Sequence, residues 1–363
     1  MTGRSRRILM TLDAVGGVWQ YALGLAQQLQ ALGDFVVLAG LGPEPEPCDR
    51  REAEAFSTLE WLASPPDWLA ADEQAVAGLG DELDRLVRGY AIDLVQVNEP
   101  GQAAHLELSC PLVAVSHSCI ATWFQAVRGT PPPNEWTWQQ GRTGVGLKRA
   151  DLVVAPSFSH RGALRACYGL LPRLAVVYNA ATNFAPSGNR NDTVFAAGRW
   201  WDEGKNGHVL DQAAALVEWP VLAAGATVGP NGSCMTFENL IALGPITHAE
   251  VLSLAGRSGL FVSPSLYEPF GLGALEAAAA GTPLLLADIP TYRELWGDVA
   301  AFFAPRDHQA LAAQINRLTQ DEALRRRMGA AARQRARRLT YQRQAVSMRR
   351  AYDSVEAVRI GRS

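Results

Sequence analysis

Two glutamates near the C-terminal end of the sequence flank a turn and the start of a helix. In SLYEPFGLGALEAAAAGTP, residues 265–283, Glu268 precedes a Pro-Phe-Gly turn and Glu276 lies eight residues later. The residues around Glu276 are small or apolar, so we expect its carboxylate to be buried and to need a partner, which a ligand hydroxyl would supply. A surface glutamate before a dipole-stabilised helix start is the alternative for this stretch, and it explains the apolar surroundings of Glu276 poorly.

The turn places backbone donors beside these carboxylates. Residues 272–280 favour a helix, so the N–H groups of Phe270, Gly271 and Leu272 are predicted to point out of its N-terminus. Such a helix start can bind a phosphate or a hydroxyl group.

Two cations follow another apolar run, in AAGRWWDEGKNG. Arg199 comes directly after the predicted strand, and Lys205 comes six residues later. A guanidinium can bridge two phosphate oxygens and an ammonium adds a compact charge, so the pair suits a diphosphate. A solvated charged turn is the alternative.

A third candidate is the glycine pair in TLDAVGGVWQYA. Gly16 and Gly17 lie between a strand and a helix, where the absence of side chains lets backbone N–H groups approach an anion. A tight strand-to-helix turn is the simpler interpretation, and the GxGxxG pattern of dinucleotide sites is absent.

Histidine and tryptophan side chains mark a further region, residues 117–142. His117 ends the apolar run LVAVSHS, and Trp123, Trp136 and Trp138 surround three consecutive prolines that exclude a continuous helix. Aromatic rings suit the apolar faces of a sugar or a lipid-like acceptor, whereas packing inside the domain is the alternative for the tryptophans. For His117 alone, a satisfied core histidine is the alternative.

These residues need strands and helices that bring them together. Short apolar runs alternate with helical patterns, which predicts an α/β protein with two doubly wound, Rossmann-like domains. The helix between the first two strands is closed by Gly33. The predicted strands are 7–13, 35–41, 93–98, 112–118, 151–157, 174–180, 193–199, 220–226, 260–266 and 283–289.

The polar, turn-rich stretch 181–193 is the best candidate for a linker. We therefore expect an N-terminal domain, 1–185, a C-terminal domain, 186–340, and a terminal helix, 341–363, that packs back on the N-terminal domain. Ligands of such sheets collect at the carboxyl ends of the strands, so a cleft between the two domains is expected to hold the ligand.

Composition excludes several classes. A net charge of −3 gives no case for nucleic-acid binding. Five scattered cysteines without a CxxC pair argue for reduced thiols in the cytoplasm and against a zinc site. The N-terminal apolar run is too short for a signal peptide, and no apolar stretch is long enough to span a membrane.

The segment 322–350 carries ten arginines and one acidic residue. Such a segment could contact an anionic membrane surface peripherally, while a solvated helix face is the alternative.

Together these motifs carry a family resemblance. PSLYEPFGLGALEAAAAGTPLLLAD resembles the signature of the retaining GT-B glycosyltransferases of family four, in which seven residues separate two glutamates. The Gly-Gly-Val loop, the GR…K segment and the runs RADLVVAPS and VYNA follow in the order of that family. YNAAT replaces the family's usual Asn-Gly pair, and RWWDEGK is longer and less aliphatic than the usual phosphate segment.

The resemblance implies a nucleotide-diphosphate sugar as donor and a sugar, glycan or lipid-linked acceptor, in polysaccharide or glycoconjugate synthesis. It implies that Glu276 binds the ribose hydroxyls, and that Glu268 binds a hydroxyl of the donor sugar beside the amides of the turn. Arg199 and Lys205 then neutralise the diphosphate, so neither a metal nor another cofactor is expected.

On the N-terminal side the resemblance implies that Gly16 and Gly17 belong to a loop that closes over the phosphates. It places His117 near the donor sugar and the acceptor. A phosphorylase or epimerase on the same fold, and a nucleotide-sugar-binding protein without transfer activity, remain as alternatives.

Overall fold

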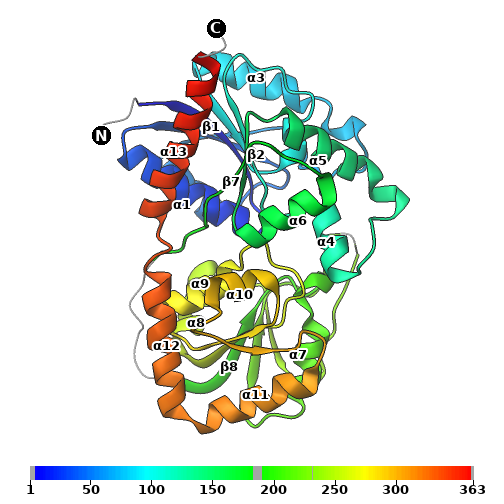
Figure 1. Ribbon diagram of the computed structural model, residues 1–363, viewed down its shortest axis with the longest axis vertical. Helices are drawn as coiled ribbons and strands as arrows, with labels where there is room; N and C mark the ends of the chain where they lie inside the picture. The colour runs from blue at the N-terminus through cyan, green and yellow to red at the C-terminus, as the bar shows by residue number, and fades with distance from the viewer. Residues whose placement is uncertain (1–4, 183–189, 231, 361–363) are drawn as a thin grey trace. The chain divides into compact units, whose positions relative to one another are not determined.

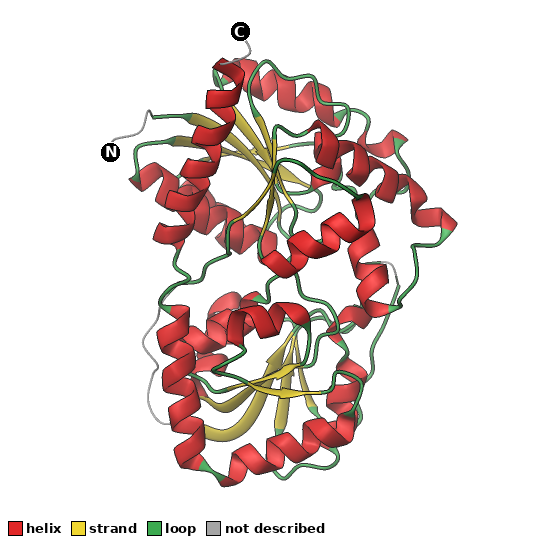
Figure 2. Cartoon of the chain, viewed as in Figure 1, coloured by secondary structure: helices red, strands yellow, loops and turns green. Residues whose placement is uncertain are grey.

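The computed structural model describes residues 5–182, 190–230 and 232–360, and the chain forms two compact α/β units (Figures 1 and 2). Unit 1 comprises Met1–Asn179 and Tyr341–Ser363, and unit 2 comprises Ala180–Thr340. The units therefore divide at 179/180 and 340/341, whereas the sequence suggested 185/186 and 340/341. Most of the expected linker, 181–193, lies outside the described residues, and its last residues already belong to a strand.

Unit 1 has a parallel seven-stranded sheet in the order β3-β2-β1-β4-β5-β6-β7. Its strands are β1 (Arg7–Asp13), β2 (Phe35–Leu41), β3 (Thr58–Trp61), β4 (Leu94–Val97), β5 (Leu112–Val115), β6 (Leu152–Ala155) and β7 (Leu174–Val176). Its helices are α1 (Gly17–Ala31), α2 (Pro47–Glu54), α3 (Leu79–Gly89), α4 (Ile120–Val127), α5 (Thr137–Arg149), α6 (Phe158–Tyr168) and α13 (Tyr341–Ile360), with short 3-10 turns η1 (Gln74–Val76), η2 (Pro100–Ala103) and η3 (Asn134–Trp136).

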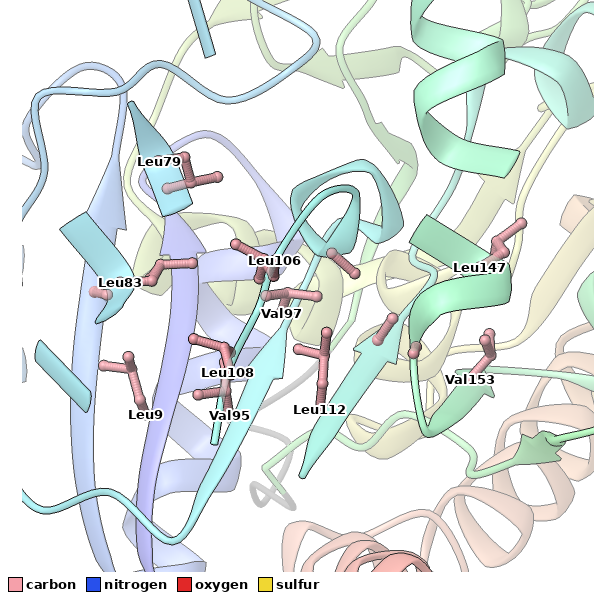
Figure 3. Close-up of a cluster of buried hydrophobic side chains, with 14 of the residues drawn as sticks. Leu9, Leu79, Leu83, Val95, Val97, Leu106, Leu108, Leu112, Leu147 and Val153 are labelled. Carbon is pink, nitrogen blue, oxygen red and sulfur yellow. The ribbon is translucent and has the colours of Figure 1, made fainter. Parts of the chain in front are cut away.

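Side chains of β1 point alternately to the two faces of the sheet, and this explains why these strands are continuous apolar runs in the sequence. Leu9 faces one buried cluster, which includes residues of α3, α5 and α6 (Figure 3). Ile8 and Met10 face the other, which includes residues of α1 and α13. Both faces of the sheet are covered, so inward- and outward-pointing residues alike are hydrophobic.

The terminal helix α13 packs against α1 in unit 1 (Figure 1). The ring of Tyr341 occupies the space beside Gly24. A Cβ atom added to Gly24 would lie 2.2 Å from Cε1 of Tyr341, so a larger residue does not fit there. At the other end of the helix, Arg6 is 2% exposed and donates to both carboxylate oxygens of Glu356 at 2.9 Å. Packing and ion pairing thus fix the C-terminal segment to the sheet of unit 1.

Unit 2 has a parallel six-stranded sheet in the order β10-β9-β8-β11-β12-β13. Its strands are β8 (Asn191–Ala197), β9 (Val221–Ala224), β10 (Ile241–Gly244), β11 (Ser258–Ser263), β12 (Leu284–Ala287) and β13 (Ala301–Phe303). Its helices are α7 (Gly207–Ala214), α8 (His248–Arg257), α9 (Leu272–Ala279), α10 (Pro290–Trp296), α11 (His308–Gln320) and α12 (Glu322–Ala336), with one 3-10 turn, η4 (Glu203–Lys205).

Both sheets confirm the predicted doubly wound α/β class. All ten predicted strands correspond to observed ones: 7–13 and 35–41 have the observed bounds, and the ends of the others differ by up to four residues. The largest differences are at 174–180, where the strand ends at Val176, and at 112–118, where it ends at Val115 and leaves His117 in the following loop. Helix α1 ends at Ala31, and Gly33 follows with φ of +93° as expected.

Candidate active site

The order of the strands marks one position in each sheet for a ligand. In unit 2, β8 and β11 are neighbours, and the chain winds outward from them in opposite directions. Loops that leave the carboxyl ends of such a pair diverge and open a crevice, which is the usual ligand position in these folds. Residues 198–206 follow β8, and residues 264–271 follow β11.

An ion pair joins these two loops. Lys205 Nζ lies 2.5 Å from Glu268 Oε1, and their side chains are 19% and 13% exposed. Ser265 Oγ donates to the same carboxylate oxygen at 3.0 Å, and the backbone N–H of Leu266 donates to the carbonyl of Gly204 at 2.8 Å. The sequence predicted both charged residues for the site, and the structure brings them into direct contact with each other.

Arg199 is the more open of the two cations. Its side chain is 44% exposed, with Nη2 3.9 Å from Asp202 Oδ2. The guanidinium also lies over the ring of Trp201, 5.5 Å from the centroid. Arg199 is thus more loosely paired than Lys205, and an anion could bind its N–H donors at the end of β8.

Helix α9 begins at Leu272, where the sequence predicted a helix start. Gly271 is its N-cap residue with φ of +87°, a conformation that favours glycine. A side chain there would also come within 2.6 Å of the Tyr292 ring, whose hydroxyl bonds Ser263 Oγ at 2.6 Å. Burial, and then the charge of Glu268, raise the pKa of Tyr292, which keeps its hydroxyl neutral. Phe270 is buried and Leu272 is half-buried.

Glu276 is largely buried, as predicted, but the protein itself supplies a partner for it. The side chain is 14% exposed, and Oε1 lies 2.8 Å from Nε2 of His248, which is 38% exposed. His248 is the first residue of α8, after a capping box formed by Thr247 and Glu250. The sequence THAE predicts that helix start, but no local pattern indicates a contact with a residue 28 positions away.

The corresponding position of unit 1 lies between β1 and β4. The loop after β1 leads directly into α1, with Gly16 as its N-cap at φ of +89° and Gly17 as its first residue. Both glycines are exposed, and an added Cβ on Gly16 would meet nothing within 4 Å. The backbone N–H of Val15 donates to Asp13 Oδ1 at 2.8 Å, which stabilises the turn.

His117 lies in the loop after β5, which is the next strand beyond β4 in the sheet. Its Nε2 is 3.3 Å from Asn98 Oδ1, and its ring meets that of Tyr21 edge to face at 4.3 Å between centroids. Burial lowers the pKa of His117 to about 3, so the imidazole is neutral near pH 7. The half-buried imidazole can therefore form hydrogen bonds as a neutral group.

The three tryptophans lie on separate short elements of unit 1. Trp123 is in α4, Trp136 ends η3 and Trp138 is in α5, and each is half-buried. Trp123 packs edge to face on Phe124 at 5.0 Å, with the Arg128 guanidinium 5.4 Å from its ring centroid. The helix is interrupted around the prolines, as predicted, and neither full burial nor full exposure describes these rings.

The arginine-rich segment is divided between the units. Residues up to 340 belong to unit 2, with α12, and those from 341 belong to unit 1, with α13. Some arginines stabilise the fold: Arg335 pairs with Asp298 at 2.6 Å, and Arg325 donates to two carbonyls of α11 at 2.6 Å. Among the exposed ones are Arg327, Arg337, Arg338 and Arg350.

The described residues contain neither a metal-binding cluster nor a membrane-spanning helix. Across 5–182, 190–230 and 232–360, no three His, Cys, Asp or Glu side chains are grouped so that they could hold a metal ion. Within the same ranges, no helix combines the length and the apolar character that crossing a membrane requires.

Comparison with known families gives two matches along the chain. Residues 15–181 match the model of Glycosyltransferase Family 4, and residues 233–335 match that of Glycosyl transferases group 1. The second match contains Glu268 and Glu276, and the first contains Gly16, Gly17 and His117.

Curated relatives align over shorter segments. Glycogen synthase of Mycobacterium tuberculosis is 46% identical over 95 residues, which are 26% of this chain and 23% of that enzyme. An O-antigen chain mannosyltransferase of Escherichia coli is 34% identical over 83 residues, 23% of this chain and 22% of the relative. The matched segment thus spans about a quarter of the length of these relatives.

Solved structures match nearly the whole chain at low identity. Sucrose-phosphate synthase from Thermosynechococcus elongatus has a TM-score of 0.78 at 18% identity and covers 98% of this chain and 100% of its own. HepE of Anabaena in complex with UDP-glucose has a TM-score of 0.76 at 17% identity, with 96% and 100% covered. This likeness confirms the predicted GT-B fold.

Proposed function

From the premise that the chain belongs to the glycosyltransferases of family 4 and group 1, we propose that it is a retaining transferase. It moves a hexose from a nucleotide-diphosphate sugar to an acceptor hydroxyl. The observation that carries this proposal is the contact of Lys205 with Glu268 in the loops that follow β8 and β11, beside the N-terminus of α9. A cation, a carboxylate and helix amides together suit a diphosphate joined to a sugar.

Cleavage of the sugar–phosphate bond develops negative charge on the leaving diphosphate and positive charge at the anomeric carbon. Lys205 and Arg199 would stabilise the diphosphate by charges already in place, with the first amides of α9 as further donors. Glu268 would accept a hydrogen bond from a hydroxyl of the sugar while Lys205 neutralises its charge. We propose that the departing phosphate takes the proton of the acceptor, so that the new bond forms on the face that the leaving group vacates.

The nucleoside would be held by Glu276, whose Oε1 would accept from the ribose hydroxyls. His248 already touches this oxygen, so it would orient the carboxylate or give way to the ribose. In unit 1, the backbone amides at Gly16 and Gly17, both exposed residues, would contact the phosphates, and His117 would contact the donor sugar or the acceptor.

The acceptor side is proposed on the chemistry of unit 1. The half-buried rings of Trp123, Trp136 and Trp138 suit the apolar faces of a glycan or a lipid-linked sugar. The relatives that carry mannosyltransferase or glycogen synthase names favour polysaccharide or glycoconjugate synthesis, which we propose to take place in the cytoplasm. Peripheral contact with an anionic membrane would use the exposed arginines, and sedimentation with anionic and neutral vesicles at low and high salt tests it.

A panel of nucleoside diphosphates and nucleotide sugars, first by thermal shift and then in transfer assays, tests the proposed function. A donor present at a hundred times its Kd adds about 2.7 kcal/mol to the free energy of unfolding. Transfer to an acceptor glycan, with the anomeric configuration read by NMR, supports the transferase. Turnover with phosphate alone would indicate a phosphorylase, donor conversion without acceptor an epimerase, and binding without turnover a binding protein.

A further inference from the structure

A chain of buried hydrogen bonds in unit 1 leads from the C-terminal helix to His117. The hydroxyl of Tyr352, on α13, donates to Gln96 Oε1 at 2.6 Å, and Gln96 Nε2 donates to Asn98 Oδ1 at 3.0 Å. The same Asn98 oxygen faces His117 Nε2 at 3.3 Å. Tyr352 and Gln96 are 0% exposed and Asn98 is 4% exposed, so water does not compete for these bonds.

The orientation of the Asn98 amide follows from its other contact. Asn98 Nδ2 lies 2.6 Å from the backbone carbonyl of Thr11, an oxygen that can only accept. The nitrogen of the amide must therefore face Thr11, and Oδ1 must face Gln96 and His117. An oxygen in this position accepts, so Gln96 presents its NH₂ group and Tyr352 donates to the remaining oxygen of Gln96.

The same reasoning assigns the proton of His117. A neutral imidazole carries one N–H, and the nitrogen that faces the accepting oxygen of Asn98 must carry it. The proton is then on Nε2, and Nδ1 has a lone pair. The ring of Tyr21 against the imidazole restrains its rotation, and no described residue donates a hydrogen bond to Nδ1.

We propose that Asn98 is a positioning residue that keeps the proton of His117 on Nε2, so that Nδ1 accepts a hydrogen bond from a sugar hydroxyl. Tyr352 supports this orientation through Gln96, which gives the C-terminal helix a part in the site. The inference rests on the proposed function for its ligand, because a glycosyl donor or acceptor supplies the hydroxyl. The position of the proton belongs to the unliganded protein and can be measured without either substrate.

The first experiment measures that proton directly. Long-range ¹H–¹⁵N correlation spectra of the full chain with labelled histidine distinguish an N–H nitrogen from a lone-pair nitrogen, and His117→Gln identifies the signals. We expect a protonated Nε2 and an unprotonated Nδ1 from about pH 5 to 8, and a mixture of both tautomers in Asn98→Leu. A proton on Nδ1 in the wild type, or an unmixed Nε2–H tautomer in folded Asn98→Leu, would overturn the proposal.

The second experiment uses a milder variant with a matched control. Tyr352→Phe removes one hydroxyl and keeps the ring, and should lower kcat roughly three- to tenfold, as expected for one neutral hydrogen bond. KM and the affinity for the nucleoside diphosphate should not change. Tyr341→Phe, on the same helix, loses a hydroxyl that donates to the Gln20 carbonyl at 3.2 Å, and should retain the wild-type rate.

Equal rates for wild type, Tyr352→Phe and Tyr341→Phe would remove Tyr352 from the site. Equal losses in both phenylalanine variants would indicate general loosening of α13 and would also overturn its proposed part. Should the wild type transfer no sugar from any donor, the proposed function fails, and the spectra still decide where the proton lies.

Discussion

The two units share a strand order. They differ in the side chains that lie near the position where this order changes direction. Near that position unit 1 has the half-buried imidazole of His117 at the end of a neutral hydrogen-bond chain. Unit 2 has an ion pair, Lys205 with Glu268, and an exposed guanidinium, Arg199. One topology can thus support a neutral, oriented group or a set of charges, and the strand order alone does not decide between them.

This contrast predicts different functions for the residues of the two units. The charged residues of unit 2 should bind the nucleotide and stabilise the leaving diphosphate. The neutral group of unit 1 should act on turnover without holding the nucleotide. Variants on each side should therefore differ in which constant they change, as well as in size.

The largest effect is expected for Lys205→Ala. Loss of the ammonium removes the positive charge that stabilises the leaving diphosphate and leaves Glu268 without its cation. We therefore expect kcat to fall roughly 10²- to 10³-fold. The chain has one other lysine, Lys148, which is exposed on α5, and Lys148→Ala is the matched control. Steady-state transfer rates measure both variants, and a folded Lys205→Ala enzyme with a near-normal rate would remove Lys205 from the site.

Glu276→Ala should act on nucleotide affinity. A charged acceptor for the ribose hydroxyls contributes about 1.5–3 kcal/mol, so Kd for the nucleoside diphosphate should rise roughly 10- to 150-fold. Calorimetry measures it, with Glu322→Ala, an exposed carboxylate of α12, as control. Because His248 also contacts Glu276, the variant His248→Ala shows which of the two side chains binds the ribose. If His248→Ala binds the nucleoside diphosphate normally and Glu276→Ala binds it weakly, the ribose contact belongs to the carboxylate of Glu276.

Sequence reasoning selected the residues of the candidate site, and the features that it missed have physical causes. The strands β3, β10 and β13 were not predicted; all three are at sheet edges and contain only three or four residues, so each gives a short signal in the sequence. The ion pair of Lys205 and the contact of Glu276 with His248 join loops and helices far apart in the chain. Tertiary packing sets such contacts, so no local spacing reports them.

Asn98 illustrates the same limit within unit 1. The residue lies at the end of the predicted strand 93–98, which is a favourable position for a functional side chain. Its effect on His117 depends on the carbonyl of Thr11, in a neighbouring strand, and on Gln96. The pairing of β1 with β4 creates that arrangement, and the sequence alone gave no reason to select Asn98.

His117→Ala should show the reverse of Glu276→Ala. Loss of one neutral hydrogen bond in the transition state should reduce kcat roughly tenfold, with an unchanged Kd for the nucleoside diphosphate. Since the pKa of His117 is lowered to about 3, its ring stays neutral and its titration should contribute nothing to the rate profile between about pH 5 and 8. His105→Ala, an exposed histidine, is the control. Weakened nucleotide binding in His117→Ala would contradict the division between the units.

The smallest effect is expected on removal of divalent metal. The proposed site neutralises the diphosphate with Arg199 and Lys205, so EDTA should change the wild-type rate less than about twofold, because both charges are part of the chain. Complete loss of activity that magnesium or manganese restores would overturn this expectation.

Lys205→Ala makes the metal test sharper. If the ammonium does the work that a metal ion does in other diphosphate sites, then removing it creates a deficit of positive charge at the leaving group. Added magnesium should then raise the residual rate of Lys205→Ala while leaving the wild type and Lys148→Ala unchanged. Equal stimulation of all three proteins would mean that the metal acts on the nucleotide sugar in solution. No stimulation of Lys205→Ala would mean that a mobile ion cannot replace an ammonium held against Glu268, and that the position of the charge matters more than its presence.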